Sequence, residues 1–275
     1  MSKARRHLII PDTQTSPGVP LAHFEWVGKA IARYKPDVLI HLGDHWDFSS
    51  LSRWSPAGSI DKERARYIKD VEVGNEALRI LENAMGDFKP KRKIILRGNH
   101  EDRMERTIAT DPRLEGLMGQ HNLDDRKLGW EVVEYFNGSP RAIVVDGVTY
   151  AHYFANPNTG RAIGGTAHYK LNSIGVPYVQ GHVQGYDIGS KQFATGKVIR
   201  GIVAGSCYLH DEPYKGMANA HWRGVVVLNA VRDGDFSEMP LDMNYLCEEY
   251  EGMSLARFLQ RNYKRAKERF SLANN

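Results

Sequence analysis

Two patterns of apolar residues alternate through the first half of the chain. Short apolar runs predict buried strands, whereas apolar residues at three- and four-residue steps predict helices. The expected strands are His7–Ile10, Val38–His41 and Lys93–Arg97. The expected helices are Leu21–Tyr34, Ala65–Met85 and Glu101–Ile108. Strands that alternate with helices are typical of a parallel sheet in the α/β class.

The second half of the chain carries more strands and fewer helices. Asp146-Gly147 is a favoured hairpin turn, which predicts pairing of the apolar segments on either side of it. The other expected elements are a helix at Thr166–Leu171 and strands at Tyr178–Gln180, Lys197–Ala204 and Gly224–Val231, the last turning at Asp233-Gly234. We expect these strands to form a second, mixed sheet. Two sheets in contact, each covered outside by helices, make a four-layer α/β/β/α sandwich with two mixed sheets.

No linker, repeat or shift in composition divides the chain. We therefore expect one domain over residues 1–243, followed by a basic amphipathic helical tail over residues 244–275. Ser254 suits the N-cap of this helix. Its apolar stripe comprises Leu255, Phe258, Leu259, Ala266 and Phe270. The tail either docks by this stripe or touches a polyanion with its basic face.

Composition narrows the class of protein. The 275 residues include 41% hydrophobic residues, and no apolar run approaches the roughly 20 residues of a membrane span. The N-terminus does not resemble a signal peptide. Cys207 and Cys247 are the two cysteines, so no disulfide framework is expected, and a cytoplasmic location is predicted. The net charge of +4 fits a substrate with phosphates.

Polar residues follow four of the predicted strands at the point where each strand ends. They are Asp12 with Gln14, Asp44 with Asp47, Asn99 with His100, and His182 with Gln184. Neighbouring strands of a sheet lie about 4.8 Å apart, so residues at adjacent strand ends converge. Ligands of open α/β sheets bind at this rim. Carboxylate, amide and imidazole groups in this arrangement predict a metal site.

Read in order, these motifs resemble those of the calcineurin-like metallophosphoesterases. The chain has D-x-Q, G-D-x-x-D, G-N-H-E, a lone His after a strand, and G-H-x-Q between Ile9 and Gln184. The superfamily pattern is D-x-H, G-D-x-x-D, G-N-H-[DE], H and G-H-x-H. The residues that flank the motifs are more similar to those of phosphoesterases often encoded by double-stranded DNA phages. This similarity would place the protein in the host cytoplasm.

The resemblance implies two divalent cations with Asp44 between them. It assigns Asp12, Gln14 and Gln184 to one metal position, and Asn99, His152 and His182 to the other. For the lone histidine, His45 and His168 are alternatives to His152. Gln14 and Gln184 replace two histidines of the pattern, and their amide oxygens are harder ligands than imidazole. We therefore expect Mn²⁺, with Mg²⁺, Fe²⁺, Ni²⁺ and Zn²⁺ as alternatives.

The resemblance also implies the reaction. A metal-bound hydroxide attacks the phosphoester, and His100 donates a proton to the leaving oxygen. His100, Asp44 and Asn99 are the predicted catalytic residues. Candidates for binding the substrate phosphate are Arg97, Arg103 and His168. Trp46, Arg53 and Trp54 either anchor a loop by packing or contact the substrate.

We expect a phosphodiesterase or nuclease that acts on DNA, RNA or nucleotide diesters. The alternatives are a phosphomonoesterase acting on a protein or small molecule, and a non-catalytic binding module. No membrane partner is expected. The natural substrate and the oligomeric state are left open by the sequence.

Overall fold

The computed structural model describes residues 3–53, 65–136, 138–211 and 219–263. One sheet has the strand order β13-β12-β1-β2-β3-β4. Its strands are β1 (Arg5–Ile10), β2 (Val38–His41), β3 (Arg92–Leu96), β4 (Glu131–Val133), β12 (Gly224–Arg232) and β13 (Asp235–Asp242). The strands β1 to β4 pair in parallel, while β12 pairs antiparallel with both β1 and β13. This sheet is therefore mixed.

The second sheet has the order β10-β11-β9-β8-β7. Its strands are β7 (Ile143–Val145), β8 (Val148–Ala151), β9 (Tyr178–Gln180), β10 (Tyr186–Gln192) and β11 (Val198–Ala204). β8, β9 and β11 run parallel, and the two outer pairs are antiparallel. A short hairpin of β5 (Tyr135–Phe136) and β6 (Ser139–Pro140) lies between the sheets in sequence.

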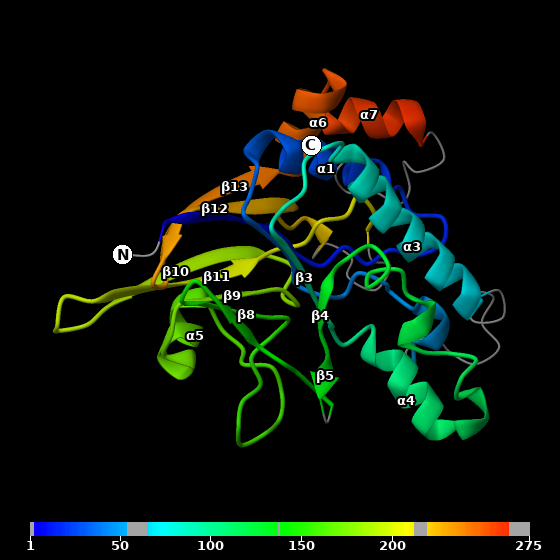
Figure 1. Cartoon of the computed structure of the whole chain (residues 1–275), viewed down its shortest axis with the longest axis horizontal. Coiled ribbons are helices and arrows are strands. Elements are labelled where there is room, and N and C mark those ends of the chain that lie inside the picture. Colours follow the sequence, from blue (N-terminus) through cyan, green and yellow to red (C-terminus); the bar gives the residue numbers. More distant parts are fainter. Residues whose placement is uncertain (1–2, 54–64, 137, 212–218, 264–275) are drawn as a thin grey trace.

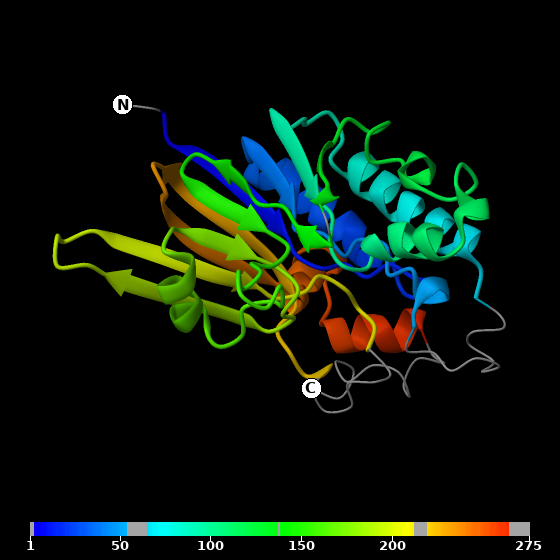
Figure 2. The same cartoon turned by 90° about the horizontal axis from the view of Figure 1, so that it is seen from below.

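Helices cover the outer faces of both sheets (Figures 1 and 2). The helices are α1 (Ala22–Tyr34), α3 (Tyr67–Ala84), α4 (Asp102–Thr110), α5 (Ala167–Ile174), α6 (Met243–Glu251) and α7 (Leu255–Asn262), with short 3₁₀ turns η1 (Ser49–Leu51), η2 (Pro112–Leu114) and η3 (Gln120–Asn122). α5 lies on the opposite side of the sheets from α6 and α7 (Figure 1). The predicted four-layer α/β/β/α sandwich is confirmed.

Strand β1 explains how the layers are held together. Leu8 and Ile10 point into the core formed with the helices, whereas Ile9 points into the core between the sheets. Successive side chains of a strand alternate between faces, so a continuous apolar run buries both. The strands predicted for the first half of the chain are confirmed, and so are its helices.

The placement of β12 corrects the sequence prediction. Gly224–Val231 was expected in the second sheet, but β12 pairs with β1 in the first. Val225 and Val227 face the helices, and Val226 faces the second sheet. An apolar run of this kind predicts burial on both faces but does not specify which sheet buries it. β4 and β10 were not predicted, because one is short and the other is a polar edge strand.

The described part of the C-terminal tail packs against the domain. The predicted helix is confirmed over Leu255–Asn262, and the Ser254 side chain accepts a hydrogen bond from the Arg257 backbone N–H. Leu255, Phe258 and Leu259 belong to the core on the helix side of the first sheet. Ala266, Phe270 and the basic residues from Lys264 onward lie outside the described residues.

We expect Phe258→Ala to lower the free energy of unfolding by about 3–5 kcal/mol, because it leaves a cavity in a packed core. The Phe258 ring meets Trp26 edge to face with 4.9 Å between centroids. Exposed Gln260 on the same helix supplies the control, since Gln260→Ala should change stability by less than about 0.5 kcal/mol. Urea denaturation of both variants tests this. Equal midpoints for the two variants would show that α7 does not contribute to the core.

Candidate metal centre

The predicted strand-end residues meet at one rim of the sandwich. Asp12 follows β1, Asp44 follows β2 and Asn99 follows β3, which are neighbours in the first sheet. His152 follows β8 and His182 follows β9, which are neighbours in the second. Because both sheets direct these ends the same way, residues from distant parts of the chain come together.

Asp44, His152 and His182 form the centre of the cluster. One potential ligand atom from each lies within 4.8 Å of the others, an arrangement that could hold a metal ion. His152 Nε2 is 3.3 Å from Asp44 Oδ2 and 3.1 Å from Asn99 Oδ1. The other ring nitrogen, Nδ1, lies 2.9 Å from the Leu42 carbonyl and donates to it. This second hydrogen bond fixes the ring so that Nε2 faces the cluster.

Asp12 and the two glutamines form a second group of polar side chains, which contacts His182 through its backbone N–H. Asp12 Oδ1 accepts a hydrogen bond of 2.9 Å from the His182 backbone N–H. Gln184 Nε2 donates to Gln14 Oε1 at 3.0 Å. Among the described residues, Asp12 Oδ2 and Gln184 Oε1 are buried without a hydrogen-bond partner. Buried acceptor oxygens rarely remain unpaired, so this donor set fits a hard divalent cation.

The electrostatics of the cluster agree with this fit. Burial raises the pKa of Asp12 to about 7, even though nearby His152 favours the ionised carboxylate. Burial also opposes ionisation of Asp44, but His100 and His152 outweigh it and hold the pKa of Asp44 well below its usual range. Burial lowers the pKa of His182 to about 4, so its ring is neutral and free to bind a metal. A cation at this rim would stabilise the ionised carboxylates.

The turns that carry these residues are sterically unusual. Gln14, Asp44 and His182 have φ values of 41°, 49° and 65°, in the left-handed region that non-glycine residues seldom adopt. A Cβ on Gly98 would lie 2.0 Å from Asp44 Oδ1, and one on Gly181 would lie 2.4 Å from Asp12 Oδ1. The glycines therefore allow the backbone to approach the two carboxylates closely. Such strain is typical of functional sites.

Glu101 holds the Asp44 turn in place. Its Oε2 accepts backbone N–H groups from Asp44 at 3.0 Å and Gly98 at 2.8 Å. Its Oε1 accepts those of His45 at 2.6 Å and Trp46 at 3.1 Å. The sequence predicted Glu101 only as the first residue of the helix Glu101–Ile108. Its place in the G-N-H-E motif was the available signal for a larger role.

His100 lies beside the cluster with its ring held by Asp47. The Nδ1–H donates to Asp47 Oδ1 at 2.7 Å, and Nε2 is 3.7 Å from Asp44 Oδ2. Burial lowers the pKa of His100, but Asp44 and Asp47 outweigh that effect and raise it above its ordinary value. Arg103 donates to the Asp47 carbonyl at 2.7 Å and lies 3.2 Å from His100 Nε2. Arg103 thus stays next to the site.

The remaining candidates lie elsewhere. The His45 ring contacts Thr13 and the Gly74 carbonyl rather than the cluster. His168, on α5, donates from Nδ1 to the Ser190 carbonyl at 2.8 Å. The prediction that Arg97 binds substrate phosphate is wrong, because its guanidinium is buried and pairs with Asp125 at 2.6 Å.

The aromatic residue found next to the cluster is not one of those named from the sequence. Trp46 is fully buried in the helix-side core, which supports a packing role. Trp54 lies outside the described residues. Tyr153 was not predicted, yet its ring centroid is 4.8 Å from that of His182. Tyr135 donates to the Tyr153 hydroxyl at 2.9 Å. The position of Tyr153 directly after His152 was the available signal.

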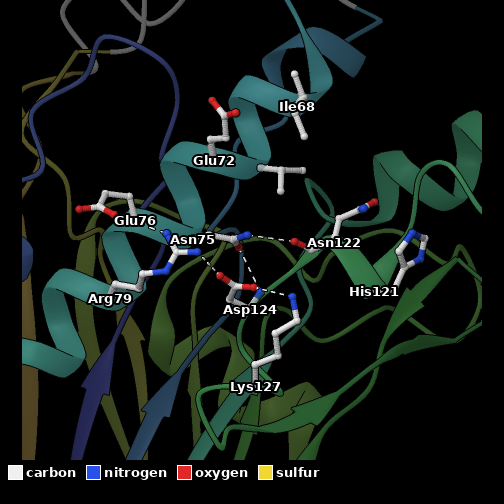
Figure 3. A pocket seen from close by; sticks show the side chains of 10 residues that line it. Ile68, Glu72, Asn75, Glu76, Arg79, His121, Asn122, Asp124 and Lys127 are labelled. Carbon is white, nitrogen blue, oxygen red and sulfur yellow. Dashed lines mark hydrogen bonds and ion pairs between the residues drawn. The ribbon is translucent and has the colours of Figure 1, made fainter.

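A surface groove with a volume of about 540 Å³ lies apart from these residues, between α3 and the segment that contains η3 (Figure 3). Its charged side chains are already paired. Asp124 accepts from Arg79 and Lys127, and its backbone N–H donates to Asn75 Oδ1. The groove contains none of the predicted site residues.

Fold and site together define a metal-dependent phosphoester hydrolase. The family model for calcineurin-like phosphoesterases matches residues 6–227, and the chain belongs to that family. Its members are dinuclear-metal enzymes that hydrolyse phosphoric esters. No curated protein matches the chain.

Among the described residues, no helix has the length and apolar character needed to cross a membrane.

We expect Glu101→Gln to lower the free energy of unfolding by about 1–3 kcal/mol, because an amide NH₂ would face backbone donors that now meet a carboxylate oxygen. Exposed Glu105 on α4 provides the control, and Glu105→Gln should be close to neutral. Denaturation in urea measures both changes. A Glu101→Gln protein as stable as the control would contradict the role assigned to this carboxylate.

Proposed function

We propose that the chain is a two-cation phosphodiesterase that acts on nucleic acids or nucleotides. The main support is the cluster of Asp44, His152 and His182, whose potential ligand atoms lie within 4.8 Å of one another, together with the buried Asp12 and Gln184 oxygens that have no hydrogen-bond partner. The net charge of +4 supports a polyanionic substrate.

We assign Asp12, Gln14 and Gln184 to one cation and Asn99, His152 and His182 to the other, with Asp44 shared between them. A carboxylate suits this shared position because its two oxygens can contact two cations about 3.5–4 Å apart. When bound, the cations would supply Lewis acidity and an activated water. The first position offers only oxygen ligands, so we propose Mn²⁺ as the preferred metal.

His100 is the proposed general acid. Its Nδ1–H is held by Asp47, which leaves Nε2 as the atom that gives a proton to the leaving oxygen. The two neighbouring carboxylates favour the protonated ring, which is the form that a general acid requires. Asp47 acts through His100 by fixing the orientation of its ring.

The proposed function is tested with two chromogenic esters. We expect the protein to hydrolyse bis-p-nitrophenyl phosphate faster than p-nitrophenyl phosphate, to prefer Mn²⁺ to Zn²⁺, and to lose activity with a chelator. Asp44→Asn keeps the shape of the side chain but removes its charge, and should reduce turnover to background. Faster monoester hydrolysis would indicate a phosphomonoesterase. Absence of turnover on either ester, with metal still bound, would indicate a binding module.

We expect the effect of His100→Ala to depend on the leaving group. An alkoxide needs a proton as the bond breaks, and general acid catalysis typically contributes about 10²–10⁴-fold. The variant should therefore lose that factor on a nucleotide diester and retain most of its activity on a nitrophenyl ester. Rate measurements on both substrates test this, and metal content is measured as the control. Equal losses on the two substrates would contradict the proton-donor role.

A further inference from the structure

A buried chain of polar side chains lies beneath the metal centre. Thr13 Oγ1 is 2.8 Å from His45 Nδ1 and 3.2 Å from His41 Nε2. His45 Nε2 is 2.9 Å from the Gly74 carbonyl on α3, and the Gly43 backbone N–H donates to His41 Nδ1 at 3.2 Å. The Thr13, His41 and His45 side chains are all at most 1% exposed. A buried network of polar side chains destabilises the folded protein unless each polar group has a hydrogen-bond partner.

The two backbone groups that contact these side chains, the Gly74 carbonyl and the Gly43 N–H, fix the direction of each hydrogen bond. The Gly74 carbonyl only accepts, so His45 carries its proton on Nε2 and presents Nδ1 as an acceptor. The Gly43 N–H only donates, so His41 carries its proton on Nε2. The Thr13 hydroxyl therefore accepts from His41 and donates to His45. With both rings neutral, this arrangement satisfies every member.

The hydrogen bonds among Thr13, His41 and His45 join the two turns that carry the proposed ligands. Thr13 separates Asp12 from Gln14 in sequence, and His45 follows Asp44. The backbones of the same turns are also joined, because Gln14 N–H donates to the Asp44 carbonyl at 2.8 Å. Gln14 and Asp44 both have positive φ, so the turns need contacts that oppose relaxation to ordinary backbone geometry.

We infer that Thr13, His41 and His45 are positioning residues that hold the Asp12–Gln14 turn against the Asp44 turn, and so maintain the oxygen-ligand metal position. The inference rests on the proposed metal centre. These side chains act on the metal through the backbone of the ligands, as outer hydrogen-bond partners do in other metal sites. The His41 Nε2–H also lies 3.2 Å from His45 Nδ1. The two rings can therefore bond to each other when the threonine hydroxyl is removed.

This alternative bond makes Thr13→Val a sharp test. The variant keeps the shape of the side chain and leaves neither ring unpaired, so the urea midpoint of the metal-free protein should stay near that of the wild type. The Mn²⁺ dissociation constant of the weaker position should rise by about 10–100-fold, as measured by isothermal titration. Excess Mn²⁺ should restore kcat with little change in KM. Thr13→Ser keeps the hydroxyl and should bind Mn²⁺ like the wild type.

A second pair of variants covers the case in which Thr13→Val does not fold. His41→Gln can place an amide N–H near the original Nε2 and keep the donor to Thr13, whereas His41→Asn is too short to do so. Only His41→Asn should weaken Mn²⁺ binding.

Two outcomes separate this inference from the proposed function. A wild-type protein that binds no Mn²⁺ would overturn the proposed metal centre. A wild-type protein that binds two ions, with Thr13→Val and His41→Asn binding them equally well, would overturn only the positioning role. If Thr13→Ser weakened Mn²⁺ binding as much as Thr13→Val, the positioning role would also be overturned.

Discussion

The Glu101 carboxylate is the constraint on which the site depends, because its two oxygens accept four backbone N–H groups from the Asp44 turn and from Gly98. Hydrogen bonds to a charged group each contribute about 1.5–3 kcal/mol, more than the strain of one left-handed residue. This carboxylate therefore ties the end of β2 to the end of β3 and to the start of α4. It explains how Asp44 keeps a positive φ while its side chain faces the second sheet.

The candidate metal centre also requires that the two sheets remain in contact. Asp44 belongs to the first sheet, whereas His152 and His182 belong to the second. The apolar core between the sheets, which includes Ile40 of β2 and Val179 of β9, brings these residues within reach of one another. Hydrophobic burial thus fixes the distance between the halves of the site, and hydrogen bonds fix the direction of each side chain. The function of the site follows from both.

Most of the fold and the outline of the site could be predicted from the sequence. The G-D-x-x-D and G-N-H-E motifs marked strand ends that do converge, because parallel strands of one sheet end at the same rim. Local sequence patterns do not predict contacts between residues that are far apart in the sequence. Arg97 pairs with Asp125, which lies in an irregular segment far along the chain. Nothing in the sequence indicated this ion pair, so Arg97 was predicted to bind the substrate phosphate. The apolar pattern of β12 predicts burial but not which sheet it joins, and the contact of His41 with Thr13 depends on strand register.

The central claim is that Asp44 lies between two cation positions of different chemistry. Anomalous scattering from crystals grown with MnCl₂ measures this directly, since each bound ion gives a separate peak at the manganese edge. We predict two peaks on opposite sides of the Asp44 carboxylate, one near Asp12 and Gln184 and the other near His152 and His182. A single peak, or two peaks that leave Asp44 uncontacted, would contradict the claim.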